Sequence, residues 1–279
     1  MMKKSLLWAL VVFLLAVSVC AQPTRRTDST LTSSTAHIAA LREQIRELTE
    51  STPSEVALAE ACRQNCADAN PQVRSDARAS RRRREATIRR LVSEINHEVD
   101  AYISRVVDPN SVDPKKLKRI VEHLLVGAEV PAVFADDHLL MIAYMFGIGI
   151  RMGPFGTALA VRAYKASGGQ FEFSDATGRD MDGFARLAVQ QLHSPTAGEV
   201  WLLASGYLTG ANGPNNAMRV YAYNGSKFRT VWAPSTVWGS FRTTVTPKGF
   251  VVHGNYYRTD KRRYDTYVLN EQGVQRLEK

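Results

Sequence analysis

The chain has 279 residues, of which 44% are hydrophobic and 23% are charged. These proportions are typical of a globular protein with a buried core, and they exclude wholesale disorder, a collagen-like repeat and a small disulfide-stapled scaffold. The formal net charge of +9 favours acidic partners such as anionic polymers, anionic lipid or acidic proteins.

The first 21 residues have the pattern of a secretory signal peptide. A start with two lysines precedes an apolar run over residues 6–17, and Val19 and Ala21 follow as small residues at alternating positions. This pattern predicts cleavage before Gln22 and an exported mature chain, periplasmic or extracellular. In the alternative interpretation Cys20 becomes a lipid-modified first residue, because the residues before it resemble a bacterial lipobox. We expect no transmembrane segment after signal removal, since the run is shorter than the roughly 20 residues that a spanning helix needs.

The composition changes near residue 135. Residues 22–134 contain two aromatic residues and a single glycine, whereas residues 135–279 contain 20 aromatic residues and 17 glycines. A segment with few glycines and few aromatic residues favours helices, and a segment rich in aromatic residues and glycine turns favours sheets. The sequence therefore predicts an α+β protein with a helical domain over 35–134 and an antiparallel all-β domain over 135–279. Residues 22–34, rich in Ser and Thr, are expected to form a flexible leader.

Four amphipathic helices are expected in the helical domain. Apolar residues recur at spacings of three and four over residues 37–50, 53–70, 71–107 and 114–125. The second helix begins at a proline after a Thr cap and the last at a proline after an Asp cap, and the third begins at about Pro71, where Asn70-Pro71 ends the second. The third helix carries an apolar seam close to a coiled-coil pattern. The helices are expected to form an antiparallel bundle, or else an extended coiled coil with another chain, which would make a homo-oligomer.

The β domain repeats a pattern of strand-like runs. Three runs at 138–144, 199–205 and 249–255 are each followed by a second, at 160–164, 217–221 and 263–267, and then by a glycine turn and a further strand. Val220-Tyr-Ala-Tyr-Asn-Gly225 is typical of a strand entering a hairpin. This cadence resembles the blades of a β-propeller, which implies about three blade-like repeats. Because propellers close with roughly 4–8 blades, an open or sandwich-like meander is the alternative.

Cys62 and Cys66 are the only cysteines after the leader. On a helix they lie one turn apart on the same face, so a disulfide is expected in an oxidising compartment. A redox motif of the thioredoxin type has two intervening residues, whereas this pair has three. No histidine stands at ligand spacing beside the pair, and we expect neither a metal nor a cofactor.

An arginine-rich segment follows on the third helix: Arg74, Arg78, Arg81, Arg82, Arg83 and Arg84. These side chains are a candidate docking surface for an anionic polymer or lipid head groups. The competing interpretation is a solvated face that acidic residues of the same domain partly neutralise. Nucleic acid is not an expected partner, because the signal peptide directs the chain out of the cell.

Two functional hypotheses come from the sequence. The first is a non-enzymatic, exported envelope protein, in which the helical domain positions or oligomerises the chain and the β domain offers a binding surface. Trp232 and Trp238 flank a loop and are candidate ligand-binding aromatics. The alternative is a secreted hydrolase whose acid–base residues, for example Asp180, Asp182 and His253, come together only in space. No nucleophile elbow, phosphate loop or metalloprotease motif is present.

Overall fold

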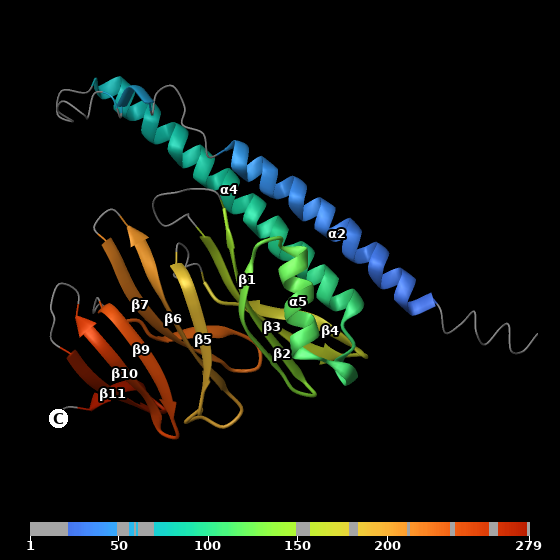
Figure 1. Cartoon of the computed structure of the whole chain (residues 1–279), viewed down its shortest axis with the longest axis vertical. Coiled ribbons are helices and arrows are strands. Elements are labelled where there is room, and N and C mark those ends of the chain that lie inside the picture. Colours follow the sequence, from blue (N-terminus) through green and yellow to red (C-terminus); the bar gives the residue numbers. More distant parts are fainter. Residues whose placement is uncertain are drawn as a thin grey trace, which may run out of the picture.

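The computed structural model describes residues 22–48, 56–58, 60, 70–148, 157–178, 184–210, 213–234, 238–256 and 262–277. Within them, helices come first and antiparallel strands follow, so the α+β class predicted from the sequence is confirmed. The principal helical elements are α2 (Gln22–Glu47), α4 (Pro71–Val106), the 3₁₀ turn η2 (Pro109–Ser111) and α5 (Pro114–Leu124). In Figure 1, α2 and α4 run side by side in opposite directions, with α5 against the strands.

The strands form three four-stranded units, each an up-and-down antiparallel meander in chain order. Unit 1 contains β1 (Glu129–Ala135), β2 (Leu139–Gly147), β3 (Thr157–Ser167) and β4 (Gln170–Ala176). Unit 2 contains β5 (Phe184–Leu192), β6 (Val200–Gly210), β7 (Gly213–Tyr223) and β8 (Phe228–Trp232). Unit 3 contains β9 (Trp238–Thr246), β10 (Gly249–Tyr256), β11 (Arg262–Asn270) and β12 (Gly273–Leu277). A bridge between Asn216 and Trp238 joins units 2 and 3 into one eight-stranded sheet.

The helix starts predicted at two prolines are confirmed by their caps. The Asn70 side chain accepts a hydrogen bond from the Gln72 amide before α4. Asp113 accepts bonds from the amides of Lys115 and Lys116 before α5. These carboxylate and amide oxygens satisfy donors that the first helical turn leaves unpaired. Most of the helix expected over 53–70 lies outside the described residues.

The leader expected over residues 22–34 is helical in the structure, because α2 begins at Gln22. Leu31 packs against the core, and Ser34 is 2% exposed, with its hydroxyl donating to Glu98 of α4 over 2.6 Å. These positions continue the spacing of Ile38 and Leu41, which are buried on the same side of the helix. The contact with α4 therefore overrides the weak helix preference of Ser and Thr.

The β domain begins earlier than predicted. The boundary expected at residue 135 falls at the end of β1, which starts at Glu129. Pro131 lies inside this strand, and the strand tolerates it because β1 is the edge of the unit 1 sheet. A proline and few aromatics made this segment look unlike the strands that follow it.

The layers are stacked in the order of the chain, with the helices on unit 1, unit 1 on unit 2 and unit 2 on unit 3. Alternate residues of β2 face opposite layers: Ile142 and Tyr144 belong to the core with the helices, and Met141 and Ala143 to the core with unit 2. Ile95 of α4 lies in the core with the helices, so the seam predicted for a coiled coil packs within the chain. Two buried faces explain why β2 reads as an unbroken apolar run.

Units 2 and 3 continue the same packing rule. On β6, Leu202 faces unit 1 and Trp201 faces unit 3. On β10, Phe250 and Val252 are fully buried against unit 2, whereas the alternate residues Val251 and His253 point to the other face and are only partly buried. The outer face of unit 3 is therefore the one broad sheet face that no described element of the chain covers.

Candidate functional site

A buried ion pair fixes α4 to unit 1. The Arg162 guanidinium on β3 donates two hydrogen bonds to Asp100 of α4, with Nε 2.7 Å from Oδ1 and the second bond from Nη2 to Oδ2. The Tyr164 hydroxyl donates to the same carboxylate over 2.9 Å. The side chains of Asp100 and Arg162 are 10% and 6% exposed, so each charge is stabilised by the other in place of water.

A second polar contact lies beside the pair, where the Tyr144 hydroxyl donates to the Asn96 amide oxygen over 2.8 Å. Burial raises the pKa of Tyr144 and, with the nearby Asp100 carboxylate, that of Tyr164. Burial alone would lower the pKa of Arg162, but its hydrogen bond to Asp100 and the neighbouring phenols outweigh burial and raise it. The cluster is therefore an ion pair with two neutral phenols at neutral pH, and we name it the anchor.

The anchor predicts a loss of stability at high pH. The phenols of Tyr144 and Tyr164 have raised pKa values when folded, and an ordinary pKa near 10 when unfolded. The unfolded chain therefore releases these protons first, and the free energy of unfolding falls above about pH 10, by about 1.4 kcal/mol per pH unit for each phenol. Urea unfolding at pH 9 to 11 measures this slope. The Tyr144→Phe/Tyr164→Phe variant should flatten it, and an equal slope in the variant would contradict the assignment.

The N-terminal half of α4 carries a basic groove. Arg74, Arg78 and Arg82 line an open hollow of about 560 Å³, whose other walls are Pro71, Ser75 and Ala79. We name these three arginines the stripe. They recur every four residues, so successive guanidiniums start about 6 Å apart along the helix. The small side chains between them leave the guanidiniums accessible.

The stripe faces the same side of α4 as the anchor. Eighteen residues make five full turns of an α-helix, and this interval separates Arg78 from Asn96 and Arg82 from Asp100. Because Asn96 and Asp100 point at unit 1, the stripe projects on that side as well, about 27 Å further along the helix axis. In Figure 1 this part of α4 extends beyond the ends of the strands. We name the N-terminal half of α4, which carries the stripe, the arm.

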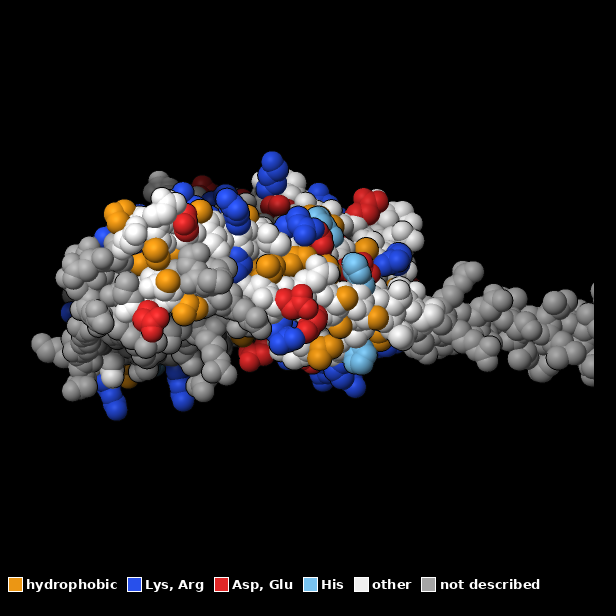
Figure 2. Space-filling model, turned by 90° about the horizontal axis from the view of Figure 1, so that it is seen from above, with side chains coloured by type: hydrophobic (Ala, Val, Ile, Leu, Met, Phe, Trp, Pro, Cys, Tyr) orange, Lys and Arg blue, Asp and Glu red, His pale blue; other side chains and the backbone are white. Residues whose placement is uncertain are grey.

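Ion pairs along α4 involve arginines outside the stripe. Arg81 pairs with Glu85 over 2.9 Å, and Arg90 pairs with Glu94 over 2.5 Å, each one helical turn away. Within the described part of the chain, neither Arg78 nor Arg82 forms an ion pair. The sequence therefore located the basic segment, and the helical spacing places Arg74, Arg78 and Arg82 of that segment along one groove. Figure 2 shows Lys and Arg side chains at several separate places on the visible face of the molecule.

The anchor was missed at the level of sequence, although each partner carries a signal. Arg162 is a charged residue of β3 whose sequence neighbours, Val161 and Ala163, are both fully buried. Asp100 interrupts the apolar seam of α4 between Val99 and Ile103. A lone charge at a buried position needs an opposite charge, but nothing in the sequence says that these two residues, 62 positions apart, are partners.

Several predicted site residues lie outside the described residues: Cys62, Cys66, Asp180 and Asp182. The expected disulfide and the Asp/His site therefore stay predictions. Among the residues that the structure describes, no group of three or more His, Cys, Asp or Glu side chains is arranged to hold a metal ion. In the same part of the chain, no helix has the length and apolarity to cross a membrane.

The candidate aromatic residues occupy different environments. Trp232, at the end of β8, is half-buried and packs with its ring 4.9 Å from that of Tyr267 and 5.7 Å from that of Phe250. These contacts place it in the core between units 2 and 3. Trp238 starts β9 opposite Tyr256, and its side chain lies outside the described part.

Comparison of the chain with protein-family models, with curated proteins and with solved structures finds no match. The geometry of the arm and of the β units is therefore the basis for assigning a function.

Proposed function

We propose that this protein is an exported, non-enzymatic envelope protein that binds an anionic polymer along the stripe of α4. One observation carries this proposal: Arg74, Arg78 and Arg82 line one groove at regular spacing on an arm that the anchor holds on the β domain. A row of guanidiniums at a fixed spacing matches a polymer with repeated charges better than it matches a single small anion. The β domain serves as the body that orients the arm.

Export is part of the same proposal and comes from the pattern of residues 1–21. Outside the cell an acidic envelope polymer is the abundant partner for a basic chain, and nucleic acid is not. We also propose that the three four-stranded units are successive blades of an open propeller-like arrangement. In support, β1 contacts β5 and β5 contacts β9, so the first strand of each unit lies beside that of the next. A closed ring would need at least one more blade.

The stripe predicts salt-dependent binding of a polyanion. We expect fluorescein-labelled dextran sulfate to bind the mature full chain and neutral dextran not to bind. Arg78→Gln/Arg82→Gln should weaken this binding about 3- to 10-fold at low salt, since an exposed charge pair contributes up to about 1 kcal/mol. The difference should shrink as ionic strength rises, because salt screens exposed charges. Fluorescence anisotropy measures both effects.

The matched control is Lys116→Gln/Arg119→Gln, which removes two exposed charges from α5 instead. If the control weakens binding as much as Arg78→Gln/Arg82→Gln does, net charge alone attracts the polymer and the stripe is not its site. Intact-mass measurement of the exported protein tests the remaining part, with a mature chain starting at Gln22 expected and a lipidated Cys20 as the contrary result.

A further inference from the structure

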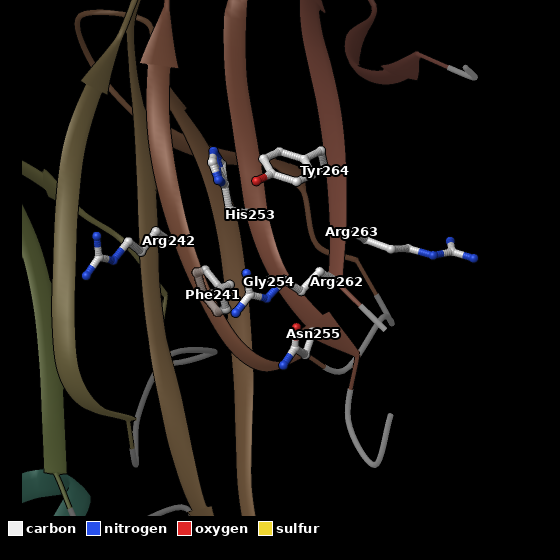
Figure 3. A pocket seen from close by; sticks show the side chains of 8 residues that line it. All are labelled: Phe241, Arg242, His253, Gly254, Asn255, Arg262, Arg263 and Tyr264. Carbon is white, nitrogen blue, oxygen red and sulfur yellow. The ribbon is translucent and has the colours of Figure 1, made fainter. Parts of the chain in front are cut away.

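The outer face of unit 3 carries a hollow of about 550 Å³ that the proposed function does not use. Residues of β9, β10 and β11 line it: Phe241, Arg242, His253, Gly254, Asn255, Arg262, Arg263 and Tyr264. Gly254 pairs in register with Phe241 and Arg263, so these three belong to the side of the sheet that faces unit 2, and the other five belong to the outer face. Three of the eight are arginines and none is acidic. Figure 3 shows His253 and Tyr264 side by side on neighbouring strands, with Arg262 and Asn255 beside them and Arg242 and Arg263 reaching outward on opposite sides.

Strand register fixes the positions of these residues. His253 lies directly opposite Arg242 on β9 and Tyr264 on β11, and the next pair on the same face joins Asn255 to Arg262. Residues paired in register point to the same face of a sheet, and Val252, the neighbour of His253, is buried against unit 2. The row Arg242–His253–Tyr264 therefore faces away from unit 2. It spans two strand spacings, about 10 Å.

The face offers both a charge and a flat ring. Tyr264 is 54% exposed, and the centroid of its ring lies 4.4 Å from that of the His253 ring with the two planes at 54°, so the two rings form a tilted aromatic ledge on the sheet. Arg242 and Arg262 lie on opposite sides of His253, and neither has an ion pair within the part of the chain described. Guanidinium forks bind carboxylates with two parallel hydrogen bonds, and the Asn255 amide can both donate to and accept from hydroxyl groups.

We propose that this hollow binds an acidic saccharide, a short chain of carboxylated sugar rings. The aromatic ledge would contact the apolar face of a sugar ring, the two arginines would bind carboxylates of successive rings, and Asn255 would bind a hydroxyl group. A second copy of the chain does not fit this face, because a twofold contact would place Arg242 and Arg262 against the same arginines. An acidic peptide would satisfy the arginines but would not need the ledge.

The experiment is isothermal titration of the mature full chain with tetragalacturonate, galactotetraose and tetraglutamate. We expect binding of tetragalacturonate, no binding of the neutral tetrasaccharide and weaker binding of tetraglutamate. Arg242→Gln/Arg262→Gln should reduce the affinity for tetragalacturonate at least about tenfold, and Tyr264→Ala should reduce it for the saccharide more than for the peptide. All three side chains are exposed, so these variants are expected to fold.

Lys165→Gln/Lys227→Gln is the matched control, since it removes two exposed charges from other parts of the β domain. Equal loss of affinity in this control, or equal affinity for tetraglutamate and tetragalacturonate, would overturn the inference. The site is independent of the stripe, so Arg78→Gln/Arg82→Gln should bind tetragalacturonate as the unmodified chain does. If Arg78→Gln/Arg82→Gln lost affinity for tetragalacturonate, the saccharide would bind the arm and the hollow would be rejected as its site. If that variant lost affinity for dextran sulfate alone, the result would concern only the proposed function.

Discussion

Replacing Asp100 with alanine is expected to lower the free energy of unfolding by about 3–5 kcal/mol, the largest effect we predict for a single residue outside the apolar core. The substitution leaves the Arg162 guanidinium 6% exposed without its carboxylate, and it removes the acceptor of the Tyr164 hydroxyl. A buried charge without a partner costs more than the ion pair itself contributes, because both groups were already desolvated. Urea unfolding followed by circular dichroism measures the change.

Two further variants separate the anchor from ordinary surface charge. Glu94→Gln breaks the exposed pair with Arg90 and should cost no more than about 0.5 kcal/mol. Asp100→Leu/Arg162→Met removes both buried charges and should recover much of the stability lost in Asp100→Ala, since apolar groups can replace a buried pair with little net cost. An Asp100→Ala protein as stable as Glu94→Gln would show that the pair does not hold α4 on unit 1.

Gly249→Ala is expected to destabilise the chain by about 3 kcal/mol or more, because the strand has no space for the added methyl group. Gly249 starts β10 opposite Val268 of β11, and a Cβ atom built there would overlap the backbone carbonyl oxygen of Tyr267. A backbone atom cannot rotate out of the way as a side chain can, so β10 and β11 must separate. Thermal unfolding measures the loss.

The comparison for this prediction is Gly147→Ala, at the end of β2, where an added Cβ would meet no atom of the described residues within 4 Å. That substitution should leave stability unchanged or raise it slightly by restricting the unfolded chain. If both variants unfold at the same temperature as the unmodified protein, the close approach of the β10 and β11 backbones at Gly249 is wrong.

The sequence was most informative where the pattern is local. The spacing of apolar residues and the prolines at Pro71 and Pro114 located α4 and α5 to within a residue or two. The three repeats also correspond to real units, since the paired runs found in the sequence are β2 and β3, β6 and β7, and β10 and β11. The turn at Asn224 and Gly225 connects β7 and β8 as predicted, with the Asn224 side chain accepting bonds from Ser226 and Lys227.

The first strand of each unit escaped detection, for a physical reason. β1, β5 and β9 carry polar or proline residues within them, such as Pro131, Arg186 and Arg242, so they lack a continuous apolar run. Their pairing with β2, β6 and β10 is what makes them strands. Tertiary contacts determine whether such segments become strands, and those contacts cannot be read from a single sequence.

The two candidate sites differ in how far the sequence locates them. The basic segment was visible in the sequence, and the helix adds that Arg74, Arg78 and Arg82 line one groove while Arg81 pairs with Glu85 one turn away. The hollow on unit 3 was not predicted, because Arg242, His253 and Tyr264 come from three strands and meet only through the register of the sheet. Of these residues only His253 had been a candidate, in a different role.

Arginine footprinting with phenylglyoxal tests the central claim most directly. Phenylglyoxal modifies accessible guanidiniums, and mass spectrometry of the digested full chain reports the extent of modification at each position. We expect saturating dextran sulfate at low salt to protect Arg78 and Arg82 of the stripe, while Arg119 on α5 is modified equally with and without the polymer. Protection at Arg119 as strong as at Arg78 and Arg82, or no protection at the stripe under conditions where the polymer binds, would contradict the proposal that α4 is the polymer-binding arm.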